Sequence, residues 1–163
     1  MSFFTKKEIS KPEKWLIETA TLIGLDFSDF THETTNEFYD HSMKRHGDYK
    51  THGAATIINA DFERILEIVK SPDYAIVGAI RKESLINVYA KIYDEITYFY
   101  FEEILTSRRN KGLRGKTLYK VTRPLSFDEV LKNISRNGKT DISKAKILNL
   151  HKNVQTAGGY PGG

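Results

Sequence analysis

The chain has 163 residues, of which 39% are apolar and 28% are charged, and this is enough to build the core of one domain. It contains no cysteine, which excludes disulfides, thiolate metal sites and a cysteine nucleophile. No stretch approaches the roughly 18 apolar residues of a membrane span, and the start of the chain lacks a signal-peptide core, so we expect a cytoplasmic location and leave open secretion by a route without a cleaved signal.

Three helices are predicted in the first half of the chain, where apolar residues recur at helical spacing between capping and breaking residues. Pro12 suits the first turn of the first helix, because its missing N–H is not needed there. Thr34 and Glu37 fit a capping box that opens the second helix, and Asp61 can cap the third. The predicted ranges are 12–25, 35–45 and 61–70.

The pattern changes to strands after Pro72. Four segments are rich in Ile, Val, Tyr and Phe and are separated by short polar links, which is typical of an antiparallel meander. Ser126 and Glu129 then form a second capping box, which opens a short helix to about residue 134. The predicted strands are 74–81, 85–93, 97–105 and 116–122.

Helices followed by a meander predict an α+β fold, in which N-terminal helices pack on one face of a four-stranded antiparallel sheet. The other face, or its rim, is then free to carry a site. We expect three parts along the chain: an N-terminal helical extension, an α+β domain and a polar, mobile C-terminal tail. They cover residues 1–30, 31–137 and 138–163.

Basic residues gather in two separate segments, 40–47 and 107–120. Between Ser107 and Arg123 the chain has seven Lys or Arg residues and no Asp or Glu. Such a bias favours an anionic ligand: a nucleic acid, an acidic partner protein or an anionic membrane surface. The alternative is a solvated loop without a function. The cations at the predicted hairpin tip that could follow a nucleic-acid backbone are Arg108, Arg109, Lys111 and Arg114.

His46 is the strongest candidate for acid–base chemistry. It follows two cations, Lys44 and Arg45, which would lower its pKa and attract phosphate. It precedes Gly47, which lets a ligand approach the backbone closely. A histidine that titrates near neutrality can take the proton from a ribose 2′-hydroxyl or protonate a leaving 5′-oxygen. The alternative is a histidine that interacts with the dipole at the end of its helix.

Two neighbouring histidines are weaker candidates. His52 lies on the following loop within reach of the same ligand, where it could contact RNA or simply be solvated. His41 lies off the face of His46 and is expected to have a structural role. The sequence has no HExxH motif, no phosphate-binding GxxxxGK[ST] loop and no acidic cluster suited to two magnesium ions. We therefore expect no metal site and no cofactor.

Residues on the predicted strands could also bind phosphate. Side chains alternate along 116–122, so Thr117 and Tyr119 should share one face and Lys116 should lie on the other. The Thr117 hydroxyl could bind a phosphate oxygen, although a β-branched residue is also ordinary in a strand. Arg81 ends the first strand, where its guanidinium could clamp a phosphate or remain solvated.

These features, in this order, resemble the phage-associated branch of the barnase, EndoU, colicin and RelE-like nuclease superfamily, over roughly residues 35–123. The resemblance implies helices before a four-stranded antiparallel sheet, and the metal-independent ribonuclease activity of toxins or phage effectors. The motifs that carry it are Lys44-Arg45-His46-Gly47, Asp61-Phe62-x-x-Ile65, Ser71-Pro72-Asp73 and Leu113-x-x-Lys116-Thr117-x-Tyr119.

The resemblance also implies partners and site residues. RNA would be the substrate, and an acidic antitoxin or immunity protein would cover the site. Arg81 lies outside the motifs of the family that we can place. The residues that match are Lys44, Arg45 and His46 in the histidine motif, and Lys116, Thr117 and Tyr119 in the terminal-strand motif.

The leading hypothesis is a metal-independent endoribonuclease that leaves a 2′,3′-cyclic phosphate and a 5′-hydroxyl. His46 would act as general base or acid, Thr117 would orient a non-bridging oxygen, and four cations would stabilise the charge of the transition state. The alternatives are a non-catalytic RNA-binding or phage assembly protein, and an interaction domain whose basic face docks an acidic inhibitor. The four cations are Lys44, Arg45, Arg81 and Lys116.

Overall fold

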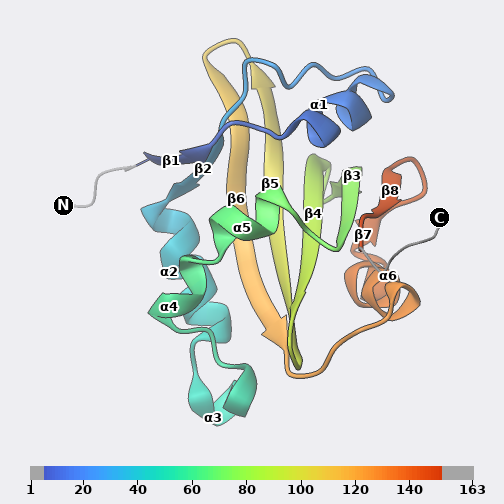
Figure 1. The fold of residues 1–163 in the computed structure, drawn as a ribbon. Coiled ribbons are helices and arrows are strands. Elements are labelled where there is room, and N and C mark those ends of the chain that lie inside the picture. Colours follow the sequence, from blue (N-terminus) through green and yellow to red (C-terminus); the bar gives the residue numbers. More distant parts are fainter. Residues whose placement is uncertain (1–5, 152–163) are drawn as a thin grey trace.

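The computed structural model describes residues 6–151, which form one large mixed sheet with helices packed against it (Figure 1). The strand order is β1-β2-β6-β5-β4-β3-β7, and β8 also pairs with β3. Neighbouring strands are antiparallel except β2 and β6, which are parallel. The strands are β1 (Lys6–Ser10), β2 (His32–Thr35), β3 (Tyr74–Arg81), β4 (Ser84–Tyr93), β5 (Ile96–Ser107), β6 (Asn110–Val121), β7 (Thr140–Asp141) and β8 (Lys146–Asn149).

The predicted α+β class is confirmed, but the predicted four-stranded antiparallel sheet is wrong, because the sheet has eight strands. The meander β3–β6 accounts for the four predicted strands. The added strands are short and lie at the two edges: β1 and β2 beside β6, and β7 and β8 beside β3. Each pairs with a segment distant in the chain, and hydrophobic alternation within so few residues does not reveal such pairing.

The helices do not form the predicted N-terminal block, because the described chain begins with β1, and β2 separates α1 from α2. The third predicted helix is divided into α4 and α5 by a turn at residues 63–64. The helices are α1 (Lys14–Thr21), α2 (Asn36–His46), α3 (Tyr49–His52), α4 (Asn59–Phe62), α5 (Ile65–Lys70) and α6 (Phe127–Ser135), with single-turn 3-10 helices η1 (Gly53–Ala55) and η2 (Arg136–Gly138).

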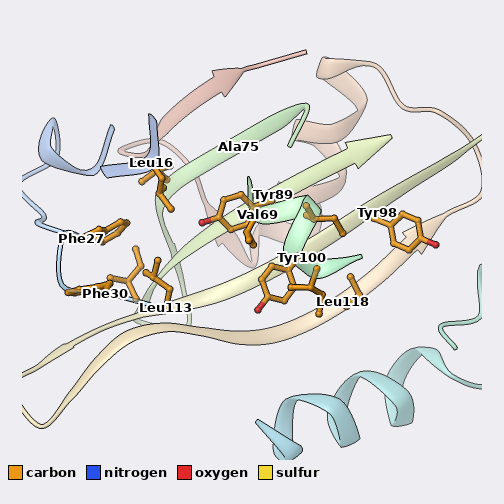
Figure 2. Packing of buried hydrophobic residues seen from close by; sticks show 14 of the residues in the cluster. Leu16, Phe27, Phe30, Val69, Ala75, Tyr89, Tyr98, Tyr100, Leu113 and Leu118 are labelled. Atoms are coloured by element: carbon orange, nitrogen blue, oxygen red, sulfur yellow. The ribbon is translucent and has the colours of Figure 1, made fainter. Parts of the chain in front are cut away.

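We call the face of β3–β6 that packs against α1, α2 and α5 the core face. Its buried cluster joins Leu16 of α1, Phe38 of α2 and Ile68 of α5 to the sheet. Figure 2 shows Leu16 in the same cluster of side chains as the fully buried Tyr89 and Tyr100. Full burial of one such side chain stabilises the fold by roughly 1.5–3 kcal/mol, so this layer holds α2 firmly against the sheet.

We call the opposite face the site face; it carries Phe99, Phe101, Thr117 and Tyr119. Helix α6 covers part of it and buries Val130 and Ile134 in a second core cluster with Phe99 and Phe101. The expectation that helices pack on one face only is therefore wrong, because α6 crosses to the other face after the meander.

Local capping residues determine where several helices begin. Ser126 Oγ accepts a hydrogen bond from Glu129 N at 3.2 Å, and the Glu129 carboxylate accepts one from Ser126 N at 2.9 Å, so this predicted capping box is confirmed. Helix α2 is capped by Thr35 instead of the predicted Thr34, because Thr35 Oγ1 accepts a hydrogen bond from Phe38 N at 3.0 Å. Asp61 is the third residue of α4 and accepts a hydrogen bond from the backbone N–H that precedes this helix.

Residues 140–149 fall in the predicted mobile tail, yet they form β7 and β8 against β3. Residues 1–5 and 152–163, which include the rest of the predicted tail, lie outside the described residues. The division of the chain at residues 30 and 137 stays a prediction. Helices long and apolar enough to cross a membrane do not occur between residues 6 and 151.

Candidate functional site

Helix α2 brings a histidine to the edge of the site face. The helix lies beside β6, where Ser42 Oγ accepts a hydrogen bond from Leu118 N at 3.2 Å. His46 is the last residue of α2, and Gly47 follows with its N–H bonded to Met43 O at 2.8 Å. A side chain at Gly47 would collide with the backbone of Met43, so glycine is required where the chain turns away from the histidine.

The His46 imidazole is partly buried and packs between two rings. Its centroid lies 5.4 Å from that of Tyr119 and 5.3 Å from that of His52. Burial, together with the nearby His52, Arg45 and His41, lowers the pKa of His46 to about 4. At neutral pH the ring is therefore uncharged and can accept a proton.

His52 is held in one tautomer by the turn that carries it. Its Nε2 lies 2.7 Å from the carbonyl oxygen of Arg45. Because a carbonyl only accepts, Nε2 must carry the hydrogen, and the Nδ1 lone pair of the neutral ring is left free. A backbone hydrogen bond from Ile57 N to His46 O, at 2.8 Å, holds the same turn against the end of α2.

Tyr119 connects His46 to helix α6 across the site face. Its ring stacks on Phe99 with 4.9 Å between centroids, and its hydroxyl donates to Asn133 Oδ1 at 2.5 Å. Burial raises the pKa of Tyr119 well above its usual range, while Arg136 and Arg81 oppose that shift. The hydroxyl therefore stays protonated as a donor, and two arginines lie near enough to act on it.

Arg81 lies at the end of β3 and is held in place on the site face. Its Nη1 donates to Thr140 Oγ1 of β7 at 2.9 Å, and its guanidinium carbon lies 5.8 Å from the centre of the Phe101 ring. The short strand β7, which was not predicted, thus positions a predicted phosphate ligand. The guanidinium remains partly exposed and can still take a further acceptor.

A β-bulge changes where Lys116 points. The pairing of β5 with β6 shifts between Phe101 and Glu102, so Phe101 faces Thr117 while Glu102 faces Gly115, and Lys116 is left over. Its Nζ lies 3.7 Å from Glu103 Oε1, on the site face. The predicted strict alternation is therefore wrong here, because the extra residue re-aims the side chain. Lys116 and Thr117 both become available to one ligand.

A comparison with protein families matches residues 10–127 to the family described as phage-Barnase-EndoU-ColicinE5/D-RelE like nuclease3. The chain belongs to this nuclease family. The match extends well beyond the stretch 35–123 on which the resemblance was recognised, and it takes in α1 and β2. Membership means a nuclease of the barnase, EndoU, colicin and RelE type, whose substrate is a nucleic acid. No curated protein and no solved structure matches the chain.

The basic hairpin of the nuclease lies far from His46. Since a strand rises about 3.3 Å per residue, the start of β6 is about 30 Å from Tyr119. Arg114, a predicted RNA ligand, forms an ion pair with the buried Glu33 at 2.7 Å and donates to Asn110 Oδ1 at 2.8 Å. The other three predicted RNA ligands are exposed: Arg108, Arg109 and Lys111.

His41 was expected to be structural, but the structure exposes it. Partial burial lowers the pKa of His41, as do the charges of Arg45, Lys116 and Lys82, while Glu37 opposes this shift. His41 therefore lies among the cations of the site. Its spacing of four residues from Arg45 was the available signal, since residues i and i+4 share a helix face. Lys44 is exposed on the same helix.

A buried polar network on the core face was not visible in the sequence. The Glu102 carboxylate accepts hydrogen bonds from Asn87 Nδ2 at 3.0 Å and from the Tyr89 hydroxyl, and it pairs with His32 Nδ1 at 2.8 Å. All four residues are fully buried, so the network serves the fold.

Among residues 6–151 no group of three or more His, Asp or Glu side chains is arranged to hold a metal ion.

Proposed function

We propose that the protein is a metal-independent endoribonuclease, which cleaves RNA by transferring a 2′-hydroxyl onto the adjacent phosphate. The observation that carries this proposal is His46, a partly buried imidazole that is neutral at pH 7 and lies beside Tyr119 and Arg45. Family membership supports nuclease activity in general. The choice of RNA and of this mechanism rests on the chemistry of the site.

His46 would act as the general base. Its lone pair takes the proton from the 2′-hydroxyl, the 2′-oxygen bonds to phosphorus, and the bond from phosphorus to the 5′-oxygen breaks. A phosphate bound beside the ring would raise the pKa of His46 from about 4 toward the working pH, because an opposite charge favours the protonated form. A general base is most effective when its pKa is close to that pH.

The leaving 5′-oxygen needs a proton, and His52 would supply it. Its ring lies 5.3 Å from that of His46. Since Nε2 is occupied by the Arg45 carbonyl, the imidazolium form of His52 would present its second N–H from Nδ1. The products would be a 2′,3′-cyclic phosphate and a 5′-hydroxyl.

Cations on three elements would stabilise the developing charge on the phosphate. Arg45 from α2, Lys116 from the bulge in β6 and Arg81 from β3 would do so, and Lys44 would neutralise a flanking phosphate. Thr117, partly exposed on the site face, would donate to a non-bridging oxygen. Fixed donors and cations of this kind can lower the barrier by several kcal/mol in a site that excludes water.

The same basic surface would suit an acidic antitoxin or immunity protein, and we propose that such a partner covers the site. Acidic side chains would pair with the cations that otherwise bind RNA. Charge complementarity is the support for this part of the proposal.

The decisive experiment incubates the protein with total RNA in EDTA and maps the new ends. Cleavage should persist and leave cyclic phosphates and 5′-hydroxyls.

His46→Ala should lower turnover about 10²-fold or more. His151→Ala is a matched control, because this exposed histidine pairs with Asp73 at the far edge of the sheet. Cleavage that needs magnesium or zinc, or a fully active His46→Ala variant, would contradict the mechanism. Binding without new ends would indicate a non-catalytic RNA-binding protein.

A further inference from the structure

A large aromatic side chain beside the proposed site is left in solvent. Tyr49 is 73% exposed, the highest value among the large apolar and aromatic residues of the described chain. One exposed aromatic residue is not unusual by itself. Its position is informative, because Tyr49 opens α3, the turn that ends with His52.

The turn that carries Tyr49 is held at both ends. Asp48 caps it by accepting a hydrogen bond from Lys50 N at 2.9 Å and another from Thr51 Oγ1 at 3.1 Å. At the other end, His52 Nε2 bonds to the carbonyl of Arg45 at 2.7 Å. Figure 1 shows α3 at the end of α2, beyond the body of the sheet. The ring is therefore presented to solvent by an anchored turn.

Tyr49 lies close to both histidines. Tyr49 is three residues from His46 and three from His52 in the sequence. Because consecutive Cα atoms are about 3.8 Å apart, its Cα lies within about 11 Å of the Cα of either histidine. Lys50, the next residue, is exposed and adds a cation beside the ring. An aromatic face next to a cation is the usual combination for single-stranded nucleic acid.

We propose that Tyr49 is the stacking platform for the nucleobase next to the cleaved phosphate, with Lys50 holding the adjoining phosphate. This inference rests on the proposed ribonuclease function, since it takes single-stranded RNA as the ligand. The platform tolerates any sequence, because every base has a π face. In the proposed mechanism His46, Lys116 and Arg81 act on the reacting phosphate, so Tyr49 governs substrate affinity and leaves the chemistry to them.

The test measures binding without cleavage. The probe is a fluorescein-labelled 2′-O-methyl oligoribonucleotide of about ten nucleotides, within the range that single-strand-binding domains cover; its blocked 2′-oxygen cannot attack. Base stacking is worth about 1–3 kcal/mol by substitution, so Tyr49→Leu should weaken binding about 5- to 150-fold. Tyr49→Phe keeps the ring and should bind within about twofold of the wild type. Leu22→Ala, at a residue 71% exposed on the far end of the molecule, should change nothing.

Salt dependence separates stacking from charge. Tyr49→Leu removes no charge, so the slope of log affinity against log salt should stay the same. Lys50→Gln should reduce its magnitude by about 0.7, the value for one phosphate contact on a single strand. Cleavage by Tyr49→Leu should show a raised KM and a smaller change in kcat.

Three outcomes would overturn the platform. They are equal affinity of Tyr49→Leu and the wild type, a loss in Tyr49→Phe as large as in Tyr49→Leu, and a change of salt slope in Tyr49→Leu. If Tyr49→Leu weakens binding but the wild type cleaves no RNA, the platform stands and the proposed nuclease mechanism fails. If RNA is cleaved and Tyr49→Leu changes neither affinity nor KM, only the platform fails. Equal melting temperatures of the variants would show that each is folded.

Discussion

Replacing Glu102 by Leu should be strongly destabilising. The carboxylate is 0% exposed and accepts hydrogen bonds from Asn87 and Tyr89, while His32 Nδ1 lies 2.8 Å away. Leu has a similar volume, so the substitution leaves little cavity. It removes the acceptor that these three buried groups share.

The magnitude follows from the groups left behind. A buried donor without a partner costs about 1–3 kcal/mol, which gives about 3–9 kcal/mol for three. Burying an ionised carboxylate is itself unfavourable, and Leu relieves that cost. The Asn87 Nδ2 group also keeps a second acceptor, the Tyr89 hydroxyl oxygen at 3.4 Å. We therefore expect a net loss of about 3–5 kcal/mol, the range for breaking one partner of a buried charged network.

Glu102→Gln should cost less, about 1–3 kcal/mol, because its amide oxygen keeps one acceptor while its NH2 group meets a donor. Glu103→Gln is the matched control on the adjacent residue. Glu103 is 25% exposed and its pair with Lys116 spans 3.7 Å, so this substitution should cost under about 1 kcal/mol. The three variants thus form a series with a fixed order of stability.

Urea unfolding followed by circular dichroism would give the free energy of unfolding for each variant. If Glu102→Leu lost no more stability than Glu103→Gln, the carboxylate would not be the acceptor that holds this layer together. Because Glu102 faces the core face, RNA cleavage by folded Glu102→Gln should equal that of the wild type.

Three other predictions concern pH, packing and RNA binding. The pKa of His46 in the folded protein is about 4 against an ordinary 6.5, so the contribution of neutral His46 to the free energy of unfolding is complete above pH 6.5 and is lost as pH falls through 4. After allowance for solvent, this loss should be about 1–2 kcal/mol. Denaturation at pH 7.5 and 4.5 should show the loss in the wild type, and His46→Asn should lack it. Gly115→Ala should lower the melting temperature, because its Cβ would lie 2.5 Å from the buried Tyr100 hydroxyl; an unchanged melting temperature would mean that β5 and β6 pair differently. Arg114→Gln should mainly destabilise the fold. Replacing the exposed Arg108, Arg109 and Lys111 by Ser should instead reduce the magnitude of the salt slope of RNA binding by about 2 units in filter-binding assays.

The sequence by itself predicted the elements whose signals are local. Segments rich in Ile, Val, Tyr and Phe, separated by short polar links, located the meander β3–β6, and Ser126 with Glu129 marked the start of α6. The basic clusters and the placing of His46 at the end of a helix were also readable, since they depend on residues next to one another. These features need only the stereochemistry of a short segment.

Only the tertiary structure decided which distant residues meet. The bulge that brings Lys116 to the site face depends on the register of β5 against β6, and Arg81 is positioned by Thr140, 59 residues away in the chain. Arg114 is paired with Glu33 across 81 residues. The pKa of His46 is set mainly by burial. Strand register, burial and long-range pairing are properties of the packed chain, because they arise from contacts between segments that no short stretch of sequence contains.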